Sequence, residues 1–178
     1  LTLQESVAVG MAEAYARSTG KTSFVSLHVD NGLANGMTLM LDALRVGTPM
    51  VVTSANYDAR KVAEGITDLA GLVRPVTKWA TELTLPDQIP STIRRAFNEA
   101  NSHPKGPVYV GLTSNALEGS AAMNIFPSGK IHGAYRPDSA AIYEAASLLL
   151  ASRSPLMLVG DRVSDDGAVD QAVELAEL

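Results

Sequence analysis

The sequence predicts an α/β protein: a doubly wound, mostly parallel sheet with helices on both faces, plus the start of a second α/β domain. Short apolar runs rich in β-branched residues alternate along the chain with segments of helical periodicity. Helices that alternate with strands must cross back over the sheet, which favours parallel pairing. The chain has 178 residues, of which 46% are hydrophobic and 19% charged, enough for one full domain and part of another.

The expected elements follow one another in a regular order over the first part of the chain. Gly20 and Gly47 each follow a helical segment and are natural ends for it. Helices are expected at residues 2–18, 33–46, within 59–72 and at 87–101. Strands are expected at residues 22–28, 49–54, 76–83 and 107–112.

A change of composition after residue 112 predicts a domain boundary. Serine, asparagine, glycine and proline become frequent there, as in a loop or linker. We expect a first domain at residues 1–115, a linker at 116–137 and an incomplete second domain at 138–178. The second domain is expected to contain a helix at 138–152 capped by Asp138, a strand at 155–159 and a helix at 168–178.

Composition and charge exclude several classes of protein. Fourteen basic and nineteen acidic side chains give a net charge of -5, so neither nucleic acid nor a membrane surface is expected as a partner. No apolar run approaches the ~20 residues of a membrane span. The absence of cysteine excludes disulfides, thiolate metal sites and cysteine nucleophiles, and it fits a cytoplasmic location. No targeting peptide is visible, and the chain is expected to be a piece of a longer protein.

Glu5 is the first candidate functional residue, and the residues around it leave two interpretations open. Thr2 and Glu5 match a capping box, in which Thr2 accepts a hydrogen bond from the helix backbone and Glu5 reaches back to the helix N-terminus. Alternatively, a carboxyl flanked by apolar Leu3 and Val7 can share a proton with a ligand nitrogen.

His28 and the turn after it form the second candidate. His28 ends an expected strand, where doubly wound sheets present side chains to ligands, although a structural role is equally open. With Asp30 it makes a His-x-Asp pair, and two ligands are too few for a metal site. The turn, residues 30–36, leads into a helix N-terminus. Its glycines, Gly32 among them, free backbone amides that can attract polar ligand atoms, or Asp30 or Asn31 can cap the helix. It matches neither the dinucleotide pattern nor the P-loop.

A series of motifs in fixed order resembles the thiamine-diphosphate-dependent enzymes. It begins with Leu3-Gln4-Glu5 and residues 9–17, VGMAEAYAR, followed by Gly20-Lys21. It continues through Leu27-His28, Gly32-Leu33-Ala34-Asn35, residues 48–53, Lys78-Trp79 and residues 106–110. The resemblance covers roughly the first two thirds of the chain as the family's pyrimidine-binding N-terminal domain, here without its first strand. Residues from 139 onward resemble the start of the central domain. Leu27-His28 and residues 76–79 look most like the benzoylformate decarboxylase branch.

This resemblance implies a 2-oxo acid decarboxylase or carboligase that takes a small-molecule substrate. Its cofactors would be thiamine diphosphate and Mg²⁺, the ion being bound by a domain absent from this chain. Glu5 would hydrogen-bond the pyrimidine ring nitrogen and favour the imino tautomer, His28 would exchange protons at the active site, and Gly32 and Asn35 would help to bind the cofactor. The family's site lies between subunits, so a homodimer or homotetramer is expected and this chain alone should be inactive.

Two departures from the family pattern leave the substrate unassigned. Asp30-Asn31-Gly32 stands where many relatives have Gly-Pro-Gly, and Ala55-Asn56 stands in place of a frequent Gly-Gln pair. Two alternatives therefore remain: an acetolactate-synthase-like carboligase, and a non-catalytic interaction module that retains the fold. The rest of the reading frame would separate them, because it either contains a diphosphate and metal motif or lacks one.

Overall fold

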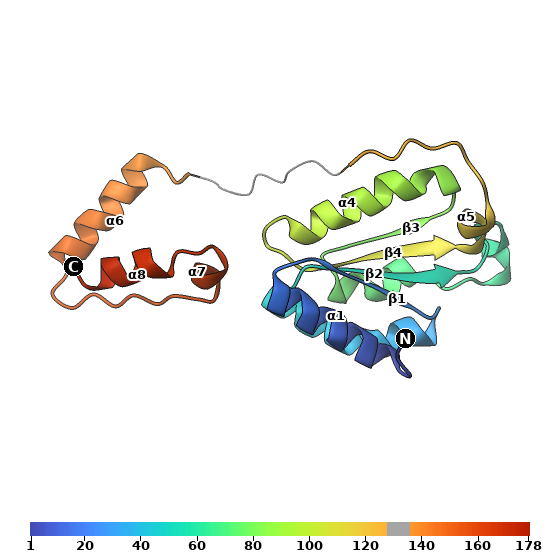
Figure 1. The fold of residues 1–178 in the computed structure, drawn as a ribbon, viewed down its shortest axis with the longest axis horizontal. Coiled ribbons are helices and arrows are strands. Elements are labelled where there is room, and N and C mark those ends of the chain that lie inside the picture. Colours follow the sequence, from blue (N-terminus) through green and yellow to red (C-terminus); the bar gives the residue numbers. More distant parts are fainter. Residues whose placement is uncertain (128–135) are drawn as a thin grey trace. The chain divides into compact units, whose positions relative to one another are not determined.

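A computed structural model describes residues 1–127 and 136–178 of the chain. The chain divides into two units, Leu1–Gly133 and Ala134–Leu178 (Figure 1). Each unit is described by itself below. Part of the linker expected at residues 116–137 lies outside the described residues.

Four parallel strands form a single sheet in the first unit, in the order β1-β2-β4-β3. One row of paired residues crosses all four strands, from Val25 through Val52 and Tyr109 to Ala80. This parallel sheet with crossover helices is the predicted fold class, which is confirmed. The strands are β1 (Ser23–Leu27), β2 (Met50–Asn56), β3 (Trp79–Leu83) and β4 (Pro107–Thr113).

Helices cover both faces of the sheet because alternate strand residues point to opposite sides. Val52 and Tyr109 face a core shared with α1 (Glu5–Thr19), α2 (Asn31–Val46) and α3 (Leu69–Val73). Val51 and Val108 face the opposite core, shared with α4 (Ile89–Asn101) and α5 (Ser114–Glu118). Figure 1 shows α1 and α4 on opposite sides of the strands. Three short 3₁₀ segments complete the unit, η1 (Ala59–Glu64), η2 (Arg74–Val76) and η3 (Pro86–Gln88).

The first two helices begin at one end of the sheet and stop at glycine. Gly20 and Gly47 adopt left-handed backbone angles, with φ of 68° and 75°, and their N–H groups bond to Ala16 and Ala43 carbonyls. Both glycines lie where the sequence predicted helix ends. The N-terminal turns of α1 and α2 consequently lie at the carboxyl edge of the sheet, where ligands bind in open α/β folds.

Two expectations about helices in the first unit are wrong. The helix expected within residues 59–72 is broken into η1 and α3, because Gly65 has φ 86° and Asp68 starts a new helix by accepting a bond from the Gly71 N–H. Conversely, α5 lies inside the segment expected to be loop, because Ala116 is buried against the sheet. A local turn decides the first outcome and a burial contact across the fold the second, and apolar periodicity reveals neither.

The second unit contains α6 (Ser139–Ala151), α7 (Arg162–Asp165) and α8 (Val169–Ala176). Asp138 caps α6, as predicted, by accepting a bond from the Ala140 N–H at 3.3 Å. The strand expected at residues 155–159 is not formed, and Leu156 and Leu158 are 92% and 95% exposed. A strand needs a paired neighbour, and the described part of this unit contains no other strand.

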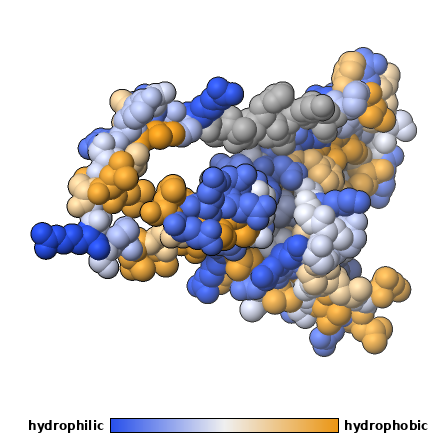
Figure 2. All heavy atoms as spheres, turned by 60° about the vertical axis from the view of Figure 1, so that its left-hand side comes forward, coloured by the Kyte–Doolittle hydropathy of each residue, from blue (hydrophilic) through white to orange (hydrophobic). Residues whose placement is uncertain are grey.

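Hydrophobic side chains reach the surface of the structure (orange in Figure 2). In the second unit they include Tyr143, Leu148 and Leu150, which are exposed along α6. None of the helices among the described residues is both long enough and apolar enough to cross a membrane.

Candidate active site

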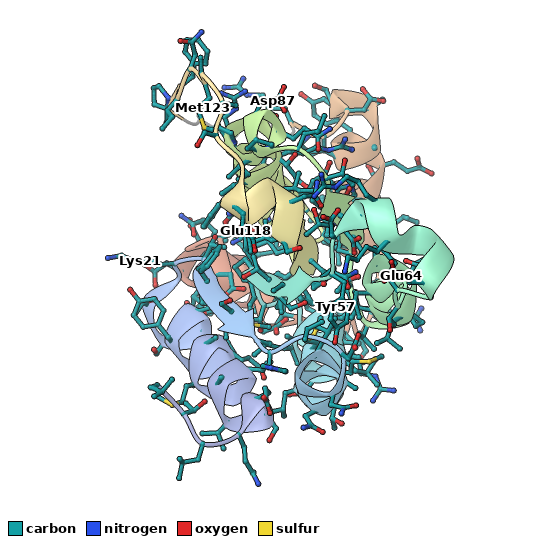
Figure 3. All side chains as sticks on the ribbon, turned by 90° about the vertical axis from the view of Figure 1, so that its right-hand side faces the viewer. Lys21, Tyr57, Glu64, Asp87, Glu118 and Met123 are labelled. Atoms are coloured by element: carbon teal, nitrogen blue, oxygen red, sulfur yellow. The ribbon has the colours of Figure 1, made fainter. Side chains whose placement is uncertain are left out.

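The candidate site lies at the carboxyl end of β1, beside the first turns of α1 and α2. His28 directly follows β1, Glu5 opens α1, and Gly32 and Asn35 lie in the first turns of α2. Figure 3 views the molecule toward this edge of the sheet, with Tyr57 and Glu118 on the segments that follow β2 and β4. The fold therefore brings together all four site residues that the sequence resemblance singled out.

Glu5 is half-buried, and its carboxyl group lies over the first turn of α2. Asn35 Nδ2 donates to Glu5 Oε2 at 3.4 Å. The other oxygen, Oε1, lies 2.9 Å from the position that a Cβ on Gly32 would occupy. The Glu5 carboxyl is thus held by a different helix from the one it opens.

The capping box predicted from Thr2 and Glu5 is wrong. The N-cap residue of α1 is Gln4, and no side chain caps the helix. The Thr2 hydroxyl instead donates to the Gln4 carbonyl at 3.0 Å. The physical reason is where the helix begins: with Gln4 as N-cap, Glu5 is the first helical residue and not the third, and its carboxyl contacts Asn35 instead.

Gly32 explains how Glu5 and His28 approach each other. A Cβ at this buried residue would lie 2.6 Å from His28 Cβ and 2.9 Å from Glu5 Oε1. Real Cβ atoms essentially never approach another atom so closely, so a side chain at position 32 would require His28 and Glu5 to shift. Gly32 therefore leaves room for the acid on one side and for the histidine on the other.

The His28 ring is exposed, and one of its two nitrogens contacts a backbone carbonyl. Its Nδ1 lies 3.1 Å from the Val29 carbonyl. A carbonyl oxygen only accepts, so Nδ1 carries the hydrogen and Nε2 of the neutral ring keeps the lone pair. The backbone thereby leaves Nε2 as the atom at which His28 can accept or return a proton.

The turn between His28 and α2 lacks the side-chain cap that was one of the two sequence interpretations of it. Asp30 occupies the N-cap position of α2, but its side chain makes no capping hydrogen bond. The Gly32 N–H donates to the Val29 carbonyl at 3.3 Å, so this amide is engaged within the turn. Side-chain capping by Asp30 is therefore wrong, because its backbone, with φ 52° and ψ -97°, does not have the extended angles of an ordinary N-cap residue.

A hollow of about 620 Å³ runs from this site along the first unit. Glu5 and His28 line it, together with α1 residues such as Met11 and Tyr15 and with β1 itself. Among the described residues β1 pairs with β2 along one edge and has no strand partner along the other. The hollow thus lies between the outer edge of the sheet and α1.

A second group of polar side chains lies near the carboxyl ends of β2, β3 and β4. Asn56 Nδ2 donates to Glu82 Oε2 at 2.8 Å, and the Ser54 and Tyr109 hydroxyls are 2.7 Å apart. Burial raises the pKa of Glu82, which lies beside the ends of these strands. Burial also raises the pKa of Tyr109 to about 12, and the charges of Glu82 and Asp30 add to the rise. Ser54, Asn56 and Tyr109 are buried and Glu82 is half-buried, and we call these four residues the buried polar cluster.

Sequence reasoning missed most of the buried polar cluster. Asn56 attracted notice as a departure from a family pattern, whereas Ser54, Glu82 and Tyr109 resemble ordinary strand residues. The strand register is what brings them together, since Ser54 pairs with Gly111 and so does Glu82. Within residues 1–127 and 136–178, no group of three or more histidine, aspartate or glutamate side chains is arranged to hold a metal ion.

The chain is similar to a family of known enzymes over its whole described length. Residues 1–83 match the family described as "Thiamine pyrophosphate enzyme, N-terminal TPP binding domain". Benzoylformate decarboxylase of Pseudomonas aeruginosa is 30% identical over 183 residues, which cover 99% of this chain and 35% of that protein. The acetolactate synthase large subunit of Haemophilus influenzae is 28% identical, with 99% of this chain and 32% of that protein covered.

A solved structure of a benzoylformate decarboxylase is also similar to this chain. The crystal structure of benzoylformate decarboxylase from Polynucleobacter necessarius matches with a TM-score of 0.89 and 26% identity, covering 99% of this chain and 34% of that one. The chain therefore spans about a third of the length of the relatives that it matches.

Proposed function

Because the chain belongs to the thiamine-diphosphate-dependent enzymes, we propose that the whole protein is a cytoplasmic 2-oxo acid decarboxylase of the benzoylformate decarboxylase type. Residues 1–115 would be its pyrimidine-binding domain, 116–137 a linker and 138–178 the beginning of its central domain. The observation that carries the proposal is the contact of Glu5 with Gly32 and Asn35 beside His28.

The residues at this site fit one part of thiamine diphosphate. A half-buried carboxyl group beside an open hollow suits a ring nitrogen that exchanges a proton. When bound, the cofactor supplies an electron sink for the pair of electrons released as a 2-oxo acid loses carbon dioxide. Mg²⁺ and the diphosphate would be bound by a part of the protein beyond this chain.

Glu5 would act by sharing a proton with the pyrimidine ring nitrogen. Asn35 donates to one carboxyl oxygen and so fixes the orientation of the group. Glycine at position 32 allows the carboxyl to lie against the backbone of α2. A rigidly held acid transfers a proton more effectively than a mobile one, because no reorganisation is needed at the moment of transfer.

His28 would move protons on the substrate side of the site. Its Nδ1 contact with Val29 fixes the tautomer and leaves Nε2 for proton exchange. Glu5 and His28 lie on the two sides of Gly32, so one short turn of the chain holds both groups. A homodimer or homotetramer would complete the site.

Carboligation is the second candidate function. The match to an acetolactate synthase along 99% of this chain favours it. Analysis of the products separates the two: a decarboxylase releases an aldehyde from one 2-oxo acid, whereas a carboligase joins the remaining acyl unit to a second carbonyl compound.

The decisive experiment uses the complete protein with thiamine diphosphate and Mg²⁺. We expect carbon dioxide release from benzoylformate or another 2-oxo acid, and loss of that activity when the cofactor is removed. Purified residues 1–178 should be inactive under the same conditions. A complete protein that releases no carbon dioxide from any 2-oxo acid and forms no carboligation product would refute the proposal and favour a non-catalytic interaction module.

A further inference from the structure

Two asparagine-glycine pairs lie in the first turns of α2, Asn31-Gly32 and Asn35-Gly36. In such a pair the backbone nitrogen of the glycine can attack the side-chain amide carbon of the asparagine, because glycine has no Cβ to hinder the approach. Both asparagines are exposed to water. How firmly the backbone and the side chain are held therefore decides which pair can react.

The second pair is held in the interior of the helix. The Gly36 N–H belongs to the ladder of hydrogen bonds within α2, and the Asn35 side chain donates to Glu5 Oε2 at 3.4 Å. This turn is also closely packed, because a Cβ on Gly36 would lie 2.8 Å from Leu27 Cδ1 and 3.0 Å from Val9 Cγ2. A reaction between Asn35 and Gly36 would require the helix to open.

The first pair lies at a loosely held helix start. Asn31 is the first residue of α2, and no side chain caps this end of the helix. Asp30, directly before it, is the single non-glycine residue with positive φ among the described residues, a conformation that costs free energy. The Gly32 N–H donates to the Val29 carbonyl over a long distance, 3.3 Å. Gly32 is buried, so the attack takes place when this turn opens, and opening it sacrifices little.

We propose that Asn31 is a site of spontaneous deamidation that needs only water. Hydroxide removes the proton of the Gly32 amide, and that nitrogen then forms a bond to Asn31 Cγ. The bond from Cγ to Nδ2 breaks, Nδ2 takes a proton from water and leaves as ammonia, and a cyclic imide remains. Water adds to one of the two imide carbonyl carbons and breaks its bond to the Gly32 nitrogen. Opening at Cγ gives aspartate, whereas opening at the main-chain carbonyl carbon gives isoaspartate, whose backbone is longer by one carbon.

Isoaspartate at position 31 would displace the glycine that follows it. Gly32 leaves room for two side chains, because a Cβ there would lie 2.9 Å from Glu5 Oε1 and 2.6 Å from His28 Cβ. A longer backbone directly before Gly32 moves it within this narrow space, so Glu5 and His28 lose their relative placement. Aspartate at position 31 keeps the length of the backbone, and a carboxylate in the first turn of a helix is favourable. The effect on turnover rests on the proposed function, whereas the modification does not.

Ageing of the complete enzyme at neutral and at mildly alkaline pH tests the modification. Both asparagines lie in one tryptic peptide, residues 22–45, so mass spectrometry with fragmentation has to assign the reacting position. We expect isoaspartate and aspartate at position 31, formed faster at alkaline pH because hydroxide removes the Gly32 proton. The reaction should be at least about tenfold slower at position 35, because the interior of a helix opens less often than its end.

Matched variants test the effect on the site. In the wild type, kcat should fall in proportion to the isoaspartate at position 31. Asn31→Gln has a side chain that closes the ring far more slowly, so it should start with wild-type kcat and keep it during ageing. Freshly prepared Asn31→Asp should also have nearly wild-type kcat, which would show that the added charge is not the cause of the loss.

Three results would count against the proposal. The first is the absence of isoaspartate at position 31, and the second is a reaction at position 35 that is as fast as at position 31. The third is an equal loss of kcat in aged wild type and aged Asn31→Gln, because ageing would then act elsewhere. If the fresh wild-type enzyme has no activity, the proposed function fails, and the isoaspartate content at position 31 still decides whether Asn31 deamidates.

Discussion

Two groups of polar side chains lie near the carboxyl edge of the same sheet, and they are built differently. Around Glu5, the hydrogen bond to Asn35 is long, at 3.4 Å, and His28 is exposed. In the buried polar cluster the bonds are short, 2.7 Å between Ser54 and Tyr109 and 2.8 Å from Asn56 to Glu82. Groups that keep free hydrogen-bonding capacity beside a hollow remain available to a ligand, whereas groups whose hydrogen bonds are satisfied within the fold stabilise it.

This difference predicts that substitutions at the two places will affect different properties. Changes of the Glu5 and His28 side chains should lower activity and leave stability nearly intact, whereas a change at the buried Gly32 should affect both properties. Changes in the buried polar cluster should lower stability and leave activity nearly intact. Four substitutions test the contrast, in order of decreasing effect.

Glu5→Gln should have the largest effect. The amide keeps the shape of the side chain but does not share a proton, so turnover of the complete enzyme should fall about 100-fold or more. The melting temperature should change little, because Glu5 is half-buried and held by one long hydrogen bond. Steady-state kinetics at saturating cofactor measure the first and thermal unfolding the second. Equal turnover in the variant and the wild type would contradict the role of Glu5.

Gly32→Ala should affect both properties. The new methyl group would meet His28 and Glu5 at 2.6 and 2.9 Å, so both side chains must move. We expect kcat to fall at least about tenfold and the free energy of unfolding to fall by about 1–3 kcal/mol. Gly20→Ala is an informative comparison. Its new Cβ would meet no atom within 4 Å, so any loss of stability would come from backbone strain at φ 68°. A Gly32→Ala enzyme with wild-type kcat would show that the close approach is dispensable.

Asn56→Ala should lower stability with little effect on turnover. Asn56 is buried and donates to both Glu82 and the Thr67 carbonyl. Removing it leaves these acceptors without their partner, which costs about 1–3 kcal/mol. Urea unfolding measures the loss. A larger loss of kcat than of stability would place the buried polar cluster in the reaction instead of the scaffold.

Glu82→Gln should produce the smallest effect, visible as a change in pH dependence. Burial raises the pKa of Glu82 in the folded chain above its ordinary value of 4.5. The folded state therefore binds this proton more tightly, and the stabilisation is lost as the pH rises from 4.5 through the raised folded value. Thermal unfolding of the variant across this pH range should be flatter than that of the wild type. Identical pH profiles would show that Glu82 titrates normally.

The sequence was sufficient for the fold class but not for every element. Alternating apolar runs and helix-ending glycines predicted the parallel sheet, because these signals are local and repeat along the chain. The prediction of a strand at residues 155–159 was wrong, because a strand needs a pairing partner and local sequence does not show whether one is present. Asp68 and Gly65 broke an expected helix through a turn that apolar periodicity does not reveal.

The site was partly predictable for a different reason. The residues alone left Glu5 open between capping and function, and the family resemblance named it together with His28, Gly32 and Asn35. Asn35 is 30 positions from Glu5, so no local pattern predicts their contact. Their catalytic roles stay predictions until the variants are measured. The backbone conformation of Asp30 was equally invisible, because composition favours aspartate as an ordinary helix cap.

The unpaired outer edge of β1 bears on how the purified chain will behave in solution. Backbone N–H and C=O groups along such an edge can bond to any extended peptide that reaches them. Beside the edge lies the hollow lined by Met11 and Tyr15, both of which are more than half exposed. A concentrated sample of residues 1–178 should therefore self-associate, and a short apolar peptide added in excess should compete with that association.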